Sequence, residues 1–201
     1  MKNSLRVLIL AGVVFAAPVL YRAYAGVTTP KSMVASPVTL SAPEALNVTD
    51  FEARLKDYLA LHQKFEGTLP ALSNKSTPAQ VESNQLALNA LIKNARADAV
   101  QGEFFTPGIR AVAVRALEGA LAGPAGKASR ESILDENTNV ANLHVNDRYP
   151  DAIPLATMPL QVLEALPKLS EGLEYRFVGE RLVLLDTHAN LIVDFTDNIL
   201  P

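Results

Sequence analysis

Hydrophobic spacing changes from helical to strand-like along this chain, and the strand-like part near the C-terminus most constrains the fold. Apolar side chains dominate three short runs there, residues 173–178, 181–185 and 191–195, and alternate with polar ones in the first. A period of two is typical of strands that bury one face. Gly179-Glu180 separates the first two runs and fits a type II′ hairpin, whose first turn position favours glycine. The pattern predicts an antiparallel meander over residues 173–196.

This turn also predicts the register of the first two strands. If Val178 pairs with Arg181, one face of the hairpin carries four large side chains. They are Tyr175, Phe177, Leu182 and Leu184. In the third run, we expect three apolar side chains to point to the same side, namely Leu191, Val193 and Phe195. A sheet with one apolar face needs a covering layer, which the preceding part of the chain is expected to supply.

Helical signals occupy residues 50–136. Three segments begin with a threonine cap, followed by proline or by Glu or Gln three residues later. These caps are Thr49, Thr77 and Thr106. Apolar residues then recur every three or four positions, which indicates one buried stripe per helix. The stripes are Phe51, Leu55, Tyr58, Leu59, His62 and Phe65; Val81, Leu88, Leu91, Ile92 and Ala95; and Ile109, Val112, Ala116, Leu117 and Leu121. A fourth, shorter helix is expected after the break at Gly123-Pro124, through Ile133 and Leu134.

Two short elements are expected between the helices and the meander, a strand at residues 143–146 and a two-turn helix at residues 160–166. The fold class is therefore α+β. We predict a small N-terminal bundle of three to four helices packed on a C-terminal antiparallel meander of three to four strands. Residues 47–201 are expected to form a single domain, with the helices in 50–136 and the meander in 173–196.

The N-terminal residues have the pattern of a cleavable signal peptide. Lys2 and Arg6 precede an apolar run of 14 residues, 7–20, which is shorter than the roughly 20 residues of a membrane-spanning helix. Ala23-Tyr24-Ala25 then has the small-x-small pattern of a cleavage site, so we expect residues 1–25 to be removed. Residues 26–46 hold three prolines and six serines or threonines and are predicted to form an extended tether.

The charge of the chain excludes some classes of partner, and its cysteine content excludes one source of stability. The predicted signal peptide contains three basic residues and no acidic one, which leaves 15 basic and 21 acidic residues and a net charge of −6. Acidity spread along the chain argues against a nucleic-acid surface and against docking on anionic lipid. The chain contains no cysteine, so its stability cannot come from disulfides even in an oxidising compartment.

Signatures of two kinds of enzyme chemistry are absent from the sequence. The nearest match to a phosphate-binding loop is residues 121–129, where Leu121 replaces the first glycine and Ala128 replaces the magnesium-binding hydroxyl. That segment follows a predicted helix rather than a strand, so it indicates a helix–helix corner. No cysteine and no G-x-S-x-G motif is present, so no activated nucleophile is indicated.

Three histidines are the remaining candidates for chemistry. His62 and Glu66 lie one turn apart on a predicted helix, but two ligands do not make a metal site. A joint site is the alternative, if the segment that carries His144 lies beside the meander; its members are His144, Asp147, Asp186 and His188. Each histidine also has a structural interpretation, in a helix stripe, on an outward strand position and in a turn. We therefore expect no catalytic, cofactor-binding or metal-binding residue and no cofactor.

Parts of the C-terminal half resemble a known group. The segment from Glu174 to Gly179, residues 184–186 and 189–195, and the stretch from Tyr149-Pro150 to Leu166-Pro167 are similar to the C-terminal region of a group of uncharacterised exported bacterial proteins. The resemblance implies a bacterial, extracytoplasmic origin. It brings no activity and no site residue with it.

Two functions are compatible with these observations. The first is a non-enzymatic binding or interaction protein of the cell envelope, exported to the periplasm or the medium, whose partner is another envelope or secreted protein. The alternative is an extracytoplasmic hydrolase that depends on carboxylates or a metal ion. Neither involves nucleic acid or, after cleavage of the signal peptide, a membrane span.

Overall fold

The computed structural model of the protein describes residues 39–136, 142–150 and 158–201. Every described helix and strand belongs to one compact unit. The predicted signal peptide and most of the predicted tether lie outside the described residues. Within those residues, no helix has the length and apolar character needed to cross a bilayer.

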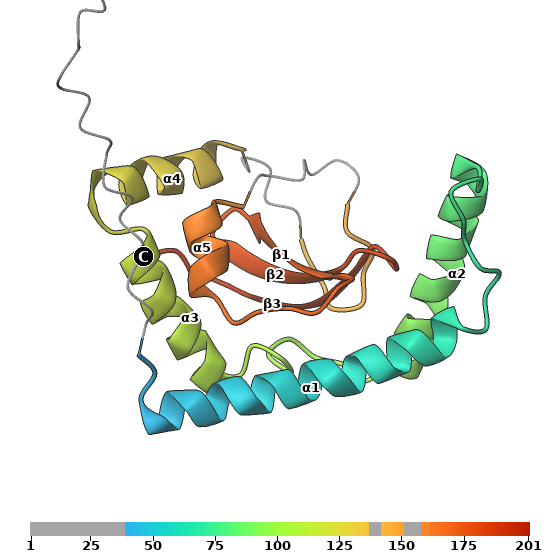
Figure 1. The fold of residues 1–201 in the computed structure, drawn as a ribbon, viewed down its shortest axis with the longest axis horizontal. Coiled ribbons are helices and arrows are strands. Elements are labelled where there is room, and N and C mark those ends of the chain that lie inside the picture. The colour runs from blue at the N-terminus through green and yellow to red at the C-terminus, as the bar shows by residue number, and fades with distance from the viewer. Residues whose placement is uncertain (1–38, 137–141, 151–157) are drawn as a thin grey trace, which may run out of the picture. The chain divides into compact units, whose positions relative to one another are not determined.

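The α+β prediction is confirmed, since the described helices precede a three-stranded antiparallel sheet (Figure 1). The helices are α1 (Ala42–Glu66), α2 (Pro78–Ala95), α3 (Pro107–Ala120), α4 (Gly123–Glu136) and α5 (Leu160–Ala165). The strands are β1 (Leu173–Val178), β2 (Arg181–Asp186) and β3 (Leu191–Thr196). Helix α1 packs against α2 and α3, and α3 also packs against α5.

Helix α1 begins earlier than the sequence predicted. Ser41 is its N-cap, and the Ser41 backbone N–H donates to the Glu44 carboxylate at 2.8 Å. Thr49, the predicted cap, lies inside the helix, so residues 42–46 are helical rather than part of the tether. Both sites have the S/T-x-x-E pattern of a capping box, and Pro43 is tolerated because it falls in the first turn. The earlier cap therefore starts the helix.

Helices α2 and α3 begin where predicted. The Thr77 hydroxyl accepts from the Gln80 N–H at 3.3 Å, and the Gln80 side chain accepts from the Thr77 N–H at 2.8 Å, which completes a capping box. Helix α3 starts directly after Thr106, although no side-chain cap bond forms there. Its whole predicted stripe is buried, whereas in α2 only Leu88 and Ile92 are buried. The N-terminal half of α2 therefore contributes little to the core.

The hairpin has the predicted register. Val178 pairs with Arg181, and Tyr175 and Phe177 pair with their expected partners in β2. Gly179 has φ of +60° and Glu180 does not have a positive φ, as a type II′ turn requires. The turn pattern thus predicted the correct register for both strands.

A β-bulge changes the face of the last strand. Leu184 pairs with Asp194, but Leu185 pairs with Ile192, so Val193 is the extra residue. Leu191 and Val193 face the helices as expected, whereas Phe195 packs on the opposite face of the sheet. The prediction for Phe195 was wrong because a bulge shifts the alternation by one residue.

Both faces of the sheet are buried, not one. The second face carries Val178, Val183, Leu185, Ile192 and Phe195 and packs against Leu143 and Tyr149. The strand expected at residues 143–146 is absent, because residues 145–146 form a turn and Arg148 makes a single bridge to β3. Backbone hydrogen bonds still hold residues 146–149 to the start of β3, whereas no described segment pairs with the outer edge of β1.

Candidate functional site

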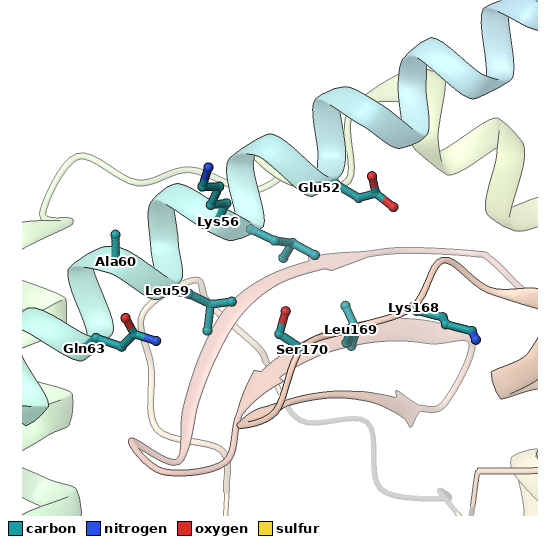
Figure 2. Close-up of a pocket in the computed structure, with 9 residues that line it drawn as sticks. Glu52, Lys56, Leu59, Ala60, Gln63, Lys168, Leu169 and Ser170 are labelled. Carbon is teal, nitrogen blue, oxygen red and sulfur yellow. The ribbon is translucent and has the colours of Figure 1, made fainter.

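An open groove of about 530 Å³ runs along one side of α1 (Figure 2). One wall is α1 and the other is residues 168–170, which precede β1. Its lining residues are Glu52, Leu55, Lys56, Leu59, Ala60, Gln63, Lys168, Leu169 and Ser170. Figure 2 shows Leu169 and Ser170 projecting toward α1, so both walls contribute side chains to the same space.

The groove has an apolar floor and a charged rim. Leu55 is buried and belongs to the core, and Leu59 and Leu169 pack against that core while staying partly exposed. Lys56 and Lys168 are exposed at the sides. This arrangement follows from helix geometry, because residues three and four apart share a face and the groove lies where the apolar stripe meets the polar one.

One end of the groove leads to a histidine cluster. Gln63 and Glu66 are three residues apart, which places them on one face of α1. On the other wall, Ser170 is two residues from Gly172, and a Cβ built on Gly172 would lie 3.8 Å from the ring of His188. Both walls of the groove therefore continue toward Glu66 and His188.

Asp186 orients this cluster from below. It ends β2 and is completely buried. Its Oδ2 atom accepts a hydrogen bond from the Tyr58 hydroxyl at 2.7 Å and lies 2.6 Å from His62 Nδ1. Its Oδ1 atom accepts from the backbone N–H groups of His188 at 3.0 Å and Ala189 at 2.9 Å. One carboxylate thus connects α1 to the turn between β2 and β3.

Burial and charge shift the pKa values of these groups in consistent directions. Burial raises the pKa of Asp186, but hydrogen bonds from His62, Ala189 and Tyr58 outweigh it and the pKa is lowered. Burial lowers the pKa of His62, but the bond to Asp186 and its charge outweigh it, so the pKa is raised. Burial first, and the Asp186 charge second, raise the pKa of Tyr58. Tyr58 therefore stays a neutral donor to an ionised Asp186.

The outer side of the cluster carries three potential metal ligands. His62 Nε2 lies 3.4 Å from Glu66 Oε2, and His188 Nδ1 lies 3.0 Å from Glu66 Oε1. The ligand atoms of these residues all lie within 4.8 Å of one another, and no other such group of three occurs among the described residues. His62 is buried, whereas 43% of the Glu66 side chain and 49% of the His188 side chain are exposed. Solvent therefore reaches the cluster at Glu66 and His188.

The structure groups the candidate residues differently from the sequence-based hypotheses, which were a pair of His62 with Glu66 and a joint site around His144. His62 and Glu66 are adjacent, as their spacing predicted, and Asp186 and His188 join them across the fold. His144 instead makes a separate, exposed pair with Asp147, 3.1 Å apart. The joint site therefore forms only in part, and it forms around α1.

Two further features have structural roles. A Cβ built on Gly126 would lie 2.1 Å from the backbone of Leu121, so the loop-like segment 121–129 is a tight corner between α3 and α4, as predicted. Asp194, which sequence reasoning did not single out, accepts hydrogen bonds from four backbone N–H groups and anchors the segment before α3 to β3. An aspartate in a strand of apolar residues was the signal for a buried carboxylate.

Comparisons with protein-family models, with curated proteins and with solved structures found no match. The resemblance to exported bacterial proteins therefore stays a prediction. The groove and the histidine cluster are the features that indicate what the molecule binds.

Proposed function

We propose that this is an exported, non-enzymatic binding protein of the cell envelope that holds an extended peptide segment of a partner protein in the groove along α1. The groove is the observation that carries this proposal. Export is supported by the signal-peptide pattern of residues 1–25.

The dimensions and lining of the groove suit a peptide. The lining on α1 runs from Glu52 to Gln63, a length of about 16 Å at 1.5 Å per residue. An extended chain covers that length with about five residues. The apolar floor suits every second side chain of such a segment, while the Gln63 amide and the Ser170 hydroxyl can hydrogen-bond its backbone.

The charges at the rim indicate the kind of peptide. Lys56 on α1 and Lys168 on the opposite wall flank the groove, and Glu52 is the only acidic residue that lines it. Complementarity therefore favours a segment with apolar residues and at least one acidic residue. The lining contains no histidine that could act as a base for Ser170, and we therefore favour binding over catalysis.

Selection from a random heptapeptide library on the full chain tests the proposal. We expect enrichment of apolar peptides that contain Asp or Glu. Ala60→Arg fills the groove with a long cation and should weaken binding of the enriched peptides by roughly tenfold or more, which is about 1.4 kcal/mol. Ala90→Arg is the matched control, since Ala90 is also an exposed helical alanine but does not line the groove. Absence of enrichment, or equal binding by both variants, would show that the groove is not the ligand site.

A further inference from the structure

The spacing of the three outer ligand atoms is close to the requirements of one metal ion. Two atoms bound to the same zinc ion at about 2.0–2.1 Å in tetrahedral geometry lie about 3.4 Å apart. His62 Nε2 and Glu66 Oε2 lie 3.4 Å apart, and the other carboxylate oxygen, Glu66 Oε1, lies 3.0 Å from His188 Nδ1. The rings of the two histidines are 5.5 Å apart between centroids, and the ligand atoms of all three residues lie within 4.8 Å of one another, so side-chain rotations that shorten the longest spacing would bring all three to one ion.

The groups behind these ligands prepare them for a metal. Metal-binding histidines usually donate their second ring N–H to a carboxylate, which fixes the tautomer and the ring orientation. His62 Nδ1 lies 2.6 Å from the buried Asp186 carboxylate, and this contact leaves His62 Nε2 directed at Glu66. The same carboxylate accepts the backbone N–H of His188, which positions the turn that carries the second histidine. One buried aspartate therefore orients the His62 ring and holds the backbone of the turn that carries His188.

The donor set selects a class of ion. Calcium and magnesium prefer six or more oxygen ligands, whereas this cluster has a single carboxylate. Two imidazole nitrogens and one carboxylate oxygen suit a first-row transition metal such as zinc. Three protein ligands also leave one tetrahedral position for water or for an atom of a bound molecule.

We infer that His62, Glu66 and His188 bind one divalent transition-metal ion, which we take to be zinc, with Asp186 as the positioning residue behind His62. This inference departs from the sequence-based expectation that all three histidines have structural roles. The competing explanation is an ion-pair cluster in which Glu66 accepts a hydrogen bond from each histidine and binds no ion. The site would bind its ion whether or not a peptide occupies the groove, because none of its ligands lines the groove.

Calorimetric titration of zinc chloride into the full chain, freed of metal with a chelator, tests the inference. We expect one equivalent to bind, with an increase in the thermal unfolding temperature because zinc binds the folded state preferentially. Glu66→Gln and His188→Gln each remove one ligand and should weaken binding by roughly a hundredfold, somewhat more than the loss of a supporting group. Both side chains are half exposed, so these variants should fold like the wild type.

His144→Gln is the matched control, because His144 is an exposed histidine paired with a carboxylate but lies outside the cluster. It should bind zinc as the wild type does. Cobalt(II) gives a second measurement, since a nearly tetrahedral site produces intense visible absorption that should be lost in His188→Gln. A folded wild-type chain that binds no zinc in this titration would overturn the inference. Equal affinity in the wild type, Glu66→Gln and His188→Gln would overturn it as well.

Discussion

Two aspartates in the sheet are completely buried, and they satisfy their carboxylates in different ways. Asp194 accepts only from backbone N–H groups, two on each oxygen, at 2.7–2.9 Å. Asp186 accepts two backbone N–H groups on one oxygen and contacts two side chains, Tyr58 and His62, with the other. Backbone donors cannot change their role, whereas a hydroxyl can rotate and an imidazole can change tautomer. A carboxylate held by the backbone serves the fold, and one held by side chains can orient a site.

The pKa values of the two aspartates shift in opposite directions, in line with their different hydrogen-bond donors. Burial raises the pKa of Asp194, and the lowering by its four N–H donors does not compensate. The pKa of Asp186 is lowered despite burial, because hydrogen bonds from the His62 side chain, the Ala189 backbone and the Tyr58 hydroxyl, and to a lesser extent the charge of His62, outweigh it. Hydrogen bonds from side chains can therefore stabilise the ionised carboxylate where backbone donors alone do not.

Asp194→Asn should produce the largest loss of stability. Whichever way the amide is placed, its NH2 group faces two backbone N–H donors, which then have no acceptor. Each unsatisfied buried donor costs about 1–3 kcal/mol, so we expect the free energy of unfolding to fall by about 3–5 kcal/mol. Urea denaturation measures this, and zinc affinity of the folded fraction should stay unchanged. A loss below about 1 kcal/mol would contradict the structural role of Asp194.

Asp186→Asn should cost less stability but affect the proposed metal site. The amide oxygen can face the N–H groups of His188 and Ala189, while its NH2 group donates to Tyr58 and to His62 Nδ1. We expect the free energy of unfolding to fall by about 1–2 kcal/mol. A donor at Nδ1 moves the His62 proton to Nε2, the atom that binds the metal, so zinc affinity should fall about 10–100-fold. The nitrogen-15 shifts of the imidazole report the tautomer, and an unchanged tautomer with unchanged affinity would contradict the positioning role.

Tyr58→Phe separates the effect of the hydrogen bond to Asp186 from the effect of the His62 tautomer. It removes the hydroxyl donor at 2.7 Å from Asp186 and leaves the contact between Asp186 and His62 in place. The free energy of unfolding should fall by about 0.5–1.5 kcal/mol. Zinc affinity, measured by calorimetry, should change less than threefold, roughly 0.6 kcal/mol. A loss of affinity as large as in Asp186→Asn would mean that Tyr58 itself supports the metal site.

Asp197 extends the comparison to a half-exposed aspartate and should have the smallest effect. Burial raises its pKa, but hydrogen bonds from Gln101 and Arg181 outweigh it, so the pKa is lowered. A lowered pKa in the folded state means that the contribution to stability is present above the unfolded value of about 3.9 and is lost as the pH falls through the folded value. Asp197→Asn should therefore lower the free energy of unfolding modestly at pH 7, where this contribution is present, and the difference from the wild type should disappear as the pH falls below 4. Urea denaturation at several pH values checks this, and an unaltered acid slope would argue against the pairing with Arg181.

Predictions from turn and capping patterns were correct where residues close together in the chain determine the structure. The turn at Gly179-Glu180 predicted a register that the pairing of Val178 with Arg181 confirms, and the caps at Thr77 and Thr106 predicted the starts of two helices. They failed where two local solutions compete. Ser41 and Thr49 both offer a capping pattern, and the bulge at Val193 reversed the face of the residues that follow it.

The candidate site could be predicted from the sequence only in part, because some of its residues are far apart in the chain. The sequence placed His62 one turn from Glu66, because helix periodicity is a local property. It could not bring His188 to them, since 122 residues separate Glu66 from His188 and only the packing of α1 on the sheet closes that distance. The groove is also a tertiary feature, because residues 168–170 carry no pattern that would distinguish them from an ordinary connection.

The sequence by itself determined the order of helices and strands, the hairpin register and the helical spacing that puts Tyr58, His62 and Glu66 on neighbouring turns. These follow from backbone sterics, hydrogen-bonding periods and turn chemistry, which act over a few residues. Only the tertiary structure decided that Asp186 is buried beneath His62, that His188 faces Glu66, and that a groove leads to them. Such contacts depend on how apolar faces pack across long separations in the chain, and many different packings would satisfy the same local patterns.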